Sequence, residues 1–349
     1  MNRTVWACFA GCSIAAMGCT ERVTPDRPDD AAVAARDMGH DAPIVDIGPP
    51  PDNVCVAIPV QLTRIIPRVM LVIDQSGSMI QDFGGQTRWH ALEDALVGTD
   101  GLVTSLSAHV RFGAVMYTDG PDDPACPELQ TTAVMLPGLS SIRSLYGMNG
   151  PEGNTPTGAA IASVLSNRAT LFDEAGSSGP EILILATDGE PGLCDPDGTG
   201  AGGDIVGGRA LTLSSTMQAH AAGIDTYVIS VGTEVANMHL QDVANAGVGH
   251  TTGTPDAPFW VATDTTMLHD ALATIASSAL PCTLELSQSV IVDRACEGTL
   301  KLGTTQFTCG IDWHADDQTH ITLNAAACDQ LRHSADDLIV TFPCDALIF

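Results

Sequence analysis

Two apolar runs that each end at a carboxylate constrain the fold of this chain most strongly. One is Arg68–Asp74, and the other is Glu181–Thr187, which Asp188 follows directly. Each is a continuous apolar run rather than an alternation, which is typical of central parallel strands buried on both faces. Ligands of open α/β sheets bind beyond the carboxyl ends of the strands. We therefore expect Asp74 and Asp188 to lie close together at one edge of a sheet.

The segment that closes the first run carries oxygen atoms at alternate positions. Ser76 and Ser78 follow Asp74, so one carboxylate and two hydroxyls could converge on a hard divalent cation. Magnesium prefers oxygen ligands in octahedral geometry and keeps several waters, so it needs few carboxylates. Alternatively, Asp74 and Ser76 could cap the following helix by accepting its free N–H groups. This segment alone leaves both interpretations open.

A third segment strengthens the metal interpretation. The loop Gly153-Asn154-Thr155-Pro156-Thr157-Gly158 places a threonine just before a helical pattern. Together with the DxSxS segment and the turn at Asp188, it makes the chain similar to the von Willebrand factor type A (vWA) family. That family carries a metal-ion-dependent adhesion site built from DxSxS, a G-x-T-x-T-G-like loop and a T-D-G turn. The loop threonine, followed by proline, is also a good helix N-cap, and both roles can coexist.

The vWA resemblance implies a specific ligand set and fold. The three hydroxyls would contact the ion, and the two carboxylates would hold it directly or through water. The expected ion is Mg²⁺, with Mn²⁺ or Ca²⁺ as alternatives. The implied fold is a Rossmann-like, mostly parallel sheet with helices on both faces. The implied metal ligands are Asp74, Ser76, Ser78, Thr155 and Asp188.

The patterns between the two runs and around them support that α/β fold. Strand and helix patterns alternate along the chain, which is typical of a parallel sheet covered on both faces. Further strands are expected over 109–117, 131–136, 225–231 and 259–262, and helices over 88–106, 155–172, 209–222, 236–246 and 265–280.

The chain changes character after Pro281. Short β-like runs follow over 284–286, 289–292, 298–302, 321–323 and 338–342. They predict a small β-rich module stapled by disulfides, since so short a segment buries little core; an extension without a fold of its own is the alternative. The expected domains are a signal peptide at 1–19, a disordered acidic, Pro-rich tether at 20–54, a vWA domain at 55–282 and the β-rich module at 283–349.

The first residues have the features of an export signal. Arg3 supplies a positive start, residues 5–17 are apolar and uncharged, and small residues precede Cys19. The segment resembles a bacterial lipoprotein signal, which implies lipid attachment at Cys19, although Ala16 stands where that pattern favours leucine. Secretion without lipid is the alternative. We expect an exported protein anchored by lipid in the cell envelope, at the outer membrane or the cell surface.

The cysteine count agrees with export. Of eleven cysteines, Cys8 and Cys12 fall in the signal and Cys19 would carry lipid, which leaves eight. An even remainder is typical of disulfides in an oxidising compartment. We expect Cys55 to pair with Cys282 because they bracket the α/β domain, whose ends should lie close together. Two long loops at the carboxyl edge suggest Cys126–Cys194, and the simplest pairing of the rest is Cys296–Cys309 and Cys328–Cys344.

Charge and motifs narrow the function. With 14 basic and 42 acidic side chains, the formal net charge is −28, which argues against nucleic acid as a partner because phosphate binding needs clustered Lys and Arg. Ser76 has no G-x-S-x-G context and no histidine motif beside it, so we expect no enzyme. The leading hypothesis is an adhesion protein whose metal binds a carboxylate of a protein partner. The alternatives are a structural envelope protein whose metal only stabilises the fold and, less favoured, a metal-dependent hydrolase.

Overall fold

The computed structural model describes residues 57–119, 126–173, 179–195, 201–251, 254–279, 282–334 and 336–349. The predicted signal peptide, the lipidation residue Cys19, the tether and Cys55 lie outside these ranges. Within them, no helix has both the length and the apolar character needed to span a membrane.

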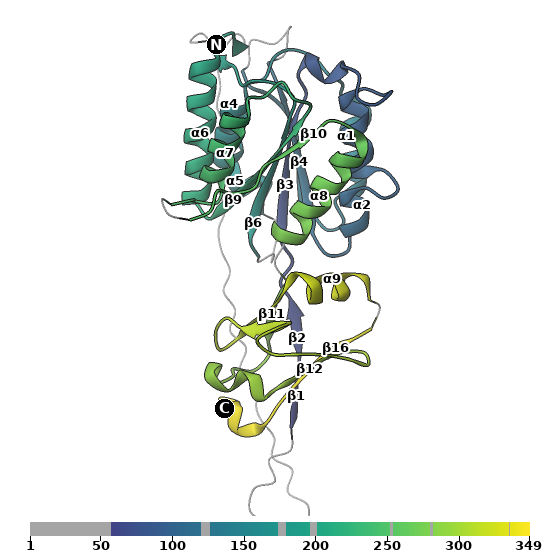
Figure 1. Cartoon of the computed structure of the whole chain (residues 1–349), viewed down its shortest axis with the longest axis vertical. Coiled ribbons are helices and arrows are strands. Elements are labelled where there is room, and N and C mark those ends of the chain that lie inside the picture. Colours follow the sequence, from purple (N-terminus) through teal and green to yellow (C-terminus); the bar gives the residue numbers. More distant parts are fainter. Residues whose placement is uncertain are drawn as a thin grey trace, which may run out of the picture. The chain divides into compact units, whose positions relative to one another are not determined.

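The α/β part is built on a six-stranded sheet, shown in the upper half of Figure 1. All neighbouring strands are parallel except the last pair, so the predicted mostly parallel sheet is confirmed. The order across the sheet is β10 (Trp260–Ala262), β9 (Ile224–Val231), β6 (Glu181–Thr187), β3 (Arg68–Asp74), β4 (Arg111–Thr118) and β5 (Glu128–Met135).

Helices cover both faces of this sheet, as expected (Figure 1). Side chains alternate along β3: Leu71 packs in the cluster on one face, and Val72 packs in the cluster on the other. The first cluster includes side chains from α1 (Arg88–Val97), α2 (Leu102–Leu106), α3 (Leu139–Met148) and α8 (Thr265–Ala279). The second includes side chains from α4 (Thr157–Ser166), α5 (Arg168–Leu171), α6 (Ile205–Ala221) and α7 (Asn237–Gly247).

Several element boundaries differ from the sequence prediction. The helix expected over 88–106 is two helices, because the chain turns between Gly98 and Gly101. A Cβ on Gly98 would lie 2.4 Å from the carbonyl oxygen of Asp94, so only glycine fits there. Helix α3 and the short hairpin of β7 (Leu193–Cys194) and β8 (Ala201–Gly202) were not anticipated. Strand β5 runs antiparallel to β4.

The C-terminal module contains two four-stranded sheets around a separate core. A helix, α9 (Ala325–His333), and the 3₁₀ turns η2 (Val292–Glu297) and η3 (Cys344–Ala346) accompany them. One sheet has the order β1 (Ile58–Val60), β16 (Leu338–Phe342), β12 (Thr299–Leu302) and β13 (Thr305–Phe307). The other has the order β14 (Trp313–Ala315), β15 (His320–Leu323), β11 (Cys282–Leu286) and β2 (Leu62–Arg64).

The strand pairing corrects the predicted boundary of the α/β domain. We placed residues 55–282 in that domain, but β1 pairs with β16 and β2 pairs with β11. The module is therefore formed from both ends of the described chain, and the α/β part is inserted into it. The physical reason is that three-residue strands bury enough surface only when they complete a sheet that other segments have begun.

The disulfides confirm two of the expected pairs and overturn two others. Cys126–Cys194 and Cys296–Cys309 are bonded as predicted. Cys282 bonds Cys328, so the expected pairs Cys55–Cys282 and Cys328–Cys344 are both wrong. Cys282 opens β11 and faces the module core, where Cys328 on α9 lies beside it. Cys344 is also disulfide-bonded.

Candidate functional site

The predicted site lies where the two apolar runs end. Strands β3 and β6 are parallel neighbours, with Ile73 opposite Ala186, so Asp74 and Asp188 emerge at the same edge of the sheet. Both side chains are fully buried. The backbone N–H of Asp188 donates to Oδ2 of Asp74 at 3.4 Å, which confirms the expected proximity of the two residues.

Three groups hold the carboxylate of Asp74. Its Oδ1 accepts the backbone N–H of Ser76 at 2.8 Å, and its Oδ2 accepts the Thr187 hydroxyl at 2.7 Å together with the longer bond from Asp188. These donors are neutral, so they orient the carboxylate without supplying positive charge. The bond to Ser76 is also the local turn that the capping alternative predicts, although Ser76 itself makes no side-chain cap bond to η1 (Gly77–Ile80).

The two serine hydroxyls gather on the other carboxylate. Ser76 Oγ and Ser78 Oγ lie 3.0 Å apart. Ser78 donates to Oδ1 of Asp188 at 2.7 Å, and Ser76 lies 3.4 Å from the same oxygen. Four of the five predicted ligands, all but Thr155, are therefore joined in one polar network.

Thr155 reaches the same place from the loop before α4. That loop is fixed by two backbone bonds, from Gly77 N–H to the Gly153 carbonyl at 3.0 Å and from Gly192 N–H to the Thr155 carbonyl at 2.9 Å. The N-cap of α4 is Pro156, with no side-chain cap bond, so Thr155 does not take up its alternative role as a cap. Its side chain lies beside Gly189, in the turn that carries Asp188.

Gly189 keeps the space between the hydroxyls open. A Cβ added there would lie 3.3 Å from Thr155 Oγ1 and 3.7 Å from Ser78 Oγ. A side chain at this position would therefore compete with any ligand that those hydroxyls share. The glycine of the T-D-G turn thus contributes space to the site.

Burial dominates the electrostatics of both carboxylates. Desolvation, with repulsion from Asp188 as the second cause, raises the pKa of Asp74 to about 7. Burial also raises the pKa of Asp188, although the hydrogen bonds from Ser78 and Arg88 offset part of this effect. Two adjacent buried carboxylates repel each other when ionised, so a cation placed between them would stabilise their charged forms.

The donor set fits a hard divalent ion. It consists of two carboxylates and three hydroxyls, all oxygen, which suit Mg²⁺ or Mn²⁺ rather than a thiophilic metal. Among the residues that the structure describes, no group of three or more His, Cys, Asp or Glu side chains could hold a metal.

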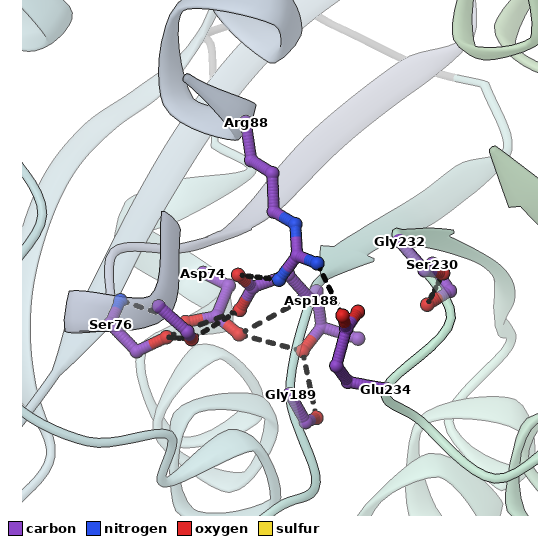
Figure 2. A network of polar contacts seen from close by, with 10 residues as sticks. Asp74, Ser76, Arg88, Asp188, Gly189, Ser230, Gly232 and Glu234 are labelled. Carbon is purple, nitrogen blue, oxygen red and sulfur yellow. Dashed lines mark hydrogen bonds and ion pairs between the residues drawn. The ribbon is translucent and has the colours of Figure 1, made fainter. Parts of the chain in front are cut away.

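Sequence reasoning missed Arg88, which reaches the site from the start of α1. Its Nη1 donates to Oδ2 of Asp188 at 2.9 Å, and its Nη2 pairs with Oε1 of Glu234 at 2.6 Å. Figure 2 shows the guanidinium between the two acids, beside the Asp74 and Ser76 network. The three residues are far apart in the sequence, so no local pattern could have indicated their contact.

The disulfide Cys126–Cys194 joins the segment before β5 to β7, in the segment that follows β6. The segment after β6 also carries Glu190, whose carboxylate bonds Arg209 of α6 and accepts the backbone N–H of Ala236 at 2.8 Å. The turn that presents Asp188 and Gly189 is thus tied to neighbouring elements on several sides.

Comparison with known proteins yields structural matches at low identity. No protein-family model matches the chain, and no curated protein matches it. The PilB minor pilin from Streptococcus sanguinis is 14% identical with a TM-score of 0.46, over 62% of this chain and 62% of its own. Proximal thread matrix protein 1 from the mussel byssus is 18% identical with a TM-score of 0.42, over 63% and 49%. Manganese-loaded TRAP protein of Plasmodium vivax is 16% identical with a TM-score of 0.43, over 77% and 98%.

The chain thus matches about half to three fifths of the length of the first two proteins. With TM-scores below 0.5, none of these similarities supports a conclusion about function. The case for a function rests on the geometry at the edge of the sheet.

Proposed function

We propose that the protein is an exported vWA-type binding protein that captures an acidic group of a protein partner through a divalent metal ion. The observation that carries this proposal is the convergence of Asp74, Ser76, Ser78 and Asp188 in one network, with Thr155 across the space left by Gly189. We expect Mg²⁺ as the ion, with Mn²⁺ or Ca²⁺ as alternatives. When bound, the ion would offer an open coordination position to a carboxylate of the partner.

The overall charge of the chain supports a role for the metal in capture. A protein with a formal net charge of −28 repels an acidic partner. A bound cation at the edge of the sheet would reverse that repulsion locally. Contact with an acidic surface would then occur at the metal rather than elsewhere on the molecule.

Exposed apolar side chains at the same edge also support partner binding. Ile80 lies in η1, two residues after Ser78, and Val206 and Met238 lie in the first turns of the helices that follow β6 and β9. They are 63%, 79% and 72% exposed. In protein interfaces, buried apolar side chains supply much of the affinity and charged contacts fix the register, so these side chains would contribute burial while the metal contact sets orientation.

We further propose that the chain acts outside the cytoplasm, anchored by lipid at Cys19 in the cell envelope, at the outer membrane or the cell surface. The sequence signal motivates the anchor. The disulfides Cys126–Cys194, Cys282–Cys328 and Cys296–Cys309 support an oxidising compartment. Mass spectrometry of the membrane fraction of the native host would detect a diacylated Cys19, and an unmodified secreted chain would contradict the anchor.

A metal titration tests the site directly. Isothermal titration of the chelator-treated protein with Mg²⁺ and Mn²⁺ should show one site, which Asp74→Ala abolishes while most of the fold remains. Gly189→Ala should weaken binding because the methyl group enters the space between Thr155 and Ser78. Asp242→Asn, at an exposed position on α7, is the matched control and should bind as the wild type does. Equal metal affinity in the wild type and Asp74→Ala would refute the site.

A pull-down of envelope and host proteins with and without EDTA then tests capture. Metal-dependent capture supports the binding function. A metal that raises thermal stability without altering capture would favour the structural alternative. The hydrolase alternative has little support, because the Ser76 hydroxyl contacts Ser78 and Asp188 rather than a histidine base.

A further inference from the structure

Arg88 is a buried cation in direct contact with a predicted metal ligand. The residue is 5% exposed, and its guanidinium bridges the buried Asp188 and the half-exposed Glu234. A guanidinium stays protonated in proteins. The site therefore contains a permanent positive charge before any metal binds.

The backbone is shaped to hold this guanidinium. Gly232 has φ of +117°, and a Cβ there would lie 2.5 Å from Glu234 Oε2 and 2.7 Å from Arg88 Nη2. Only glycine leaves room for the ion pair at this point, and Figure 2 shows Gly232 beside Glu234. The bridge is thus accommodated by the loop after β9 as well as by α1.

The two carboxylates differ in how their charge is balanced. Oδ2 of Asp188 is occupied by Arg88, and its Oδ1 by the serine hydroxyls. Asp74 accepts hydrogen bonds from neutral donors, the backbone N–H groups of Ser76 and Asp188 and the Thr187 hydroxyl. The charge of a divalent ion at this site would therefore be balanced chiefly by Asp74, because the charge of Asp188 is already shared with Arg88.

We propose that Arg88, held by Glu234, is a positioning residue that neutralises Asp188 and so leaves surplus positive charge on the bound metal for an anionic group of the partner. This inference rests on the proposed metal site. It assigns two opposite effects to Arg88. The residue lowers the affinity of the protein for the metal and raises the affinity of the bound metal for a carboxylate. Charges in a buried site are poorly screened, so both effects should be measurable.

A merely structural role for Arg88 predicts a different outcome. If the guanidinium only braced α1 against the sheet edge, any variant of the bridge would loosen the site and weaken metal binding. The charge argument instead predicts opposite signs for the two partners: loss of Arg88 tightens metal binding, and loss of the negative charge on Glu234 weakens it.

The test measures Mn²⁺ affinity of the full chain from the free-Mn²⁺ signal in electron paramagnetic resonance. Arg88→Met keeps much of the aliphatic stem and removes the charge. It should bind Mn²⁺ about tenfold more tightly, the scale on which one neighbouring charge shifts an equilibrium. Arg88→Lys keeps the charge and should stay near the wild type. Glu234→Gln should bind about two- to fivefold more weakly, by the same electrostatic reasoning at a more exposed position.

The second readout uses acetate as a simple carboxylate probe. At constant ionic strength, and after correction for Mn²⁺–acetate complexes in solution, acetate should tighten Mn²⁺ binding to the wild type, because linked binding is reciprocal. Arg88→Met should lose that gain. An acetate effect in Arg88→Met equal to that of the wild type would overturn the proposal.

The remaining outcomes separate this inference from the proposed function. If the wild type binds Mn²⁺ no better than Asp74→Ala, the metal site itself fails, and this inference fails with it. If that difference is present but folded Arg88→Met binds Mn²⁺ equally or more weakly, only the role of Arg88 is refuted. Should Arg88→Met not fold, Glu234→Gln still tests the charge argument: unchanged or tighter Mn²⁺ binding would overturn the proposal.

Discussion

The α/β part and the C-terminal module are stabilised in different ways. The α/β sheet has a core on each face, made chiefly of aliphatic side chains and alanine, and it includes residues that are fully buried, such as Leu71 and Leu183. The module has one smaller core, in which an aromatic pair, Trp313 and Phe342, packs near the bonded cysteines Cys282 and Cys328. The fraction of surface buried rises with size, so the larger part is held by packing and the smaller part needs covalent bonds.

Removal of the disulfide inside the module core should have the largest effect. Cys282→Ser with Cys328→Ser should cost the module about 2–5 kcal/mol, as is usual for small disulfide-bonded units. Hydrogen exchange should speed up in β11 and β15 and stay slow in β3 and β6. The double serine variant at Cys126 and Cys194 is the control. If protection from exchange fell equally in the module strands and in β3 and β6, the two parts would unfold as one unit. The comparison would then fail.

Metal binding should stabilise only the α/β part. A ligand that binds the folded state at 100 times its Kd adds about 2.7 kcal/mol, so Mg²⁺ at that excess should raise the unfolding transition of the α/β part alone. Differential scanning calorimetry of Asp74→Ala should show no such shift. A shift of the module transition by Mg²⁺ would mean that the two parts are energetically coupled.

A matched pair of core substitutions tests the same comparison with a smaller expected change in the free energy of unfolding. Ile184 in β6 and Ile321 in β15 are both buried, at 1% and 0% exposure. Replacing either by valine should cost about 0.5–1.5 kcal/mol. Urea unfolding, followed separately in each part, should show that Ile184→Val lowers the stability of the α/β part. Ile321→Val should lower the stability of the module. If either substitution lowered the urea midpoints of both parts, the two cores would not be separate.

The loop disulfide should affect partner capture rather than the packing of either core. Cys126–Cys194 joins loops at the edge of the sheet rather than core residues. The double serine variant should keep Mg²⁺ affinity but weaken Mg²⁺-dependent capture of a partner, because ordered loops lower the entropy lost on docking. Titration and pull-down measure the two properties separately. Unchanged capture would mean that the bond only protects the loops from proteolysis.

The same contrast explains what the sequence could and could not predict. The apolar runs that end at Asp74 and Asp188 are continuous, and this local pattern predicts buried parallel strands. The sheet and the proximity of the two carboxylates could therefore be predicted from the sequence. Arg88 starts a helix, where a charged residue is ordinarily exposed, and only the folded chain brings it to Asp188. In the module, the pairing of β1 with β16 joins opposite ends of the chain. Three-residue strands leave too little periodicity to reveal such partners.

The insertion of the α/β part into the module has a mechanical consequence. Strands β1, β2 and β3 succeed one another along the chain, and β3 ends at Asp74. Tension applied ahead of Ile58 therefore travels along the backbone of these strands straight to a residue of the candidate site. The other strands of the module reach this path only through the hydrogen bonds of the pairs β1–β16 and β2–β11, so they are not part of the covalent route between Ile58 and Asp74.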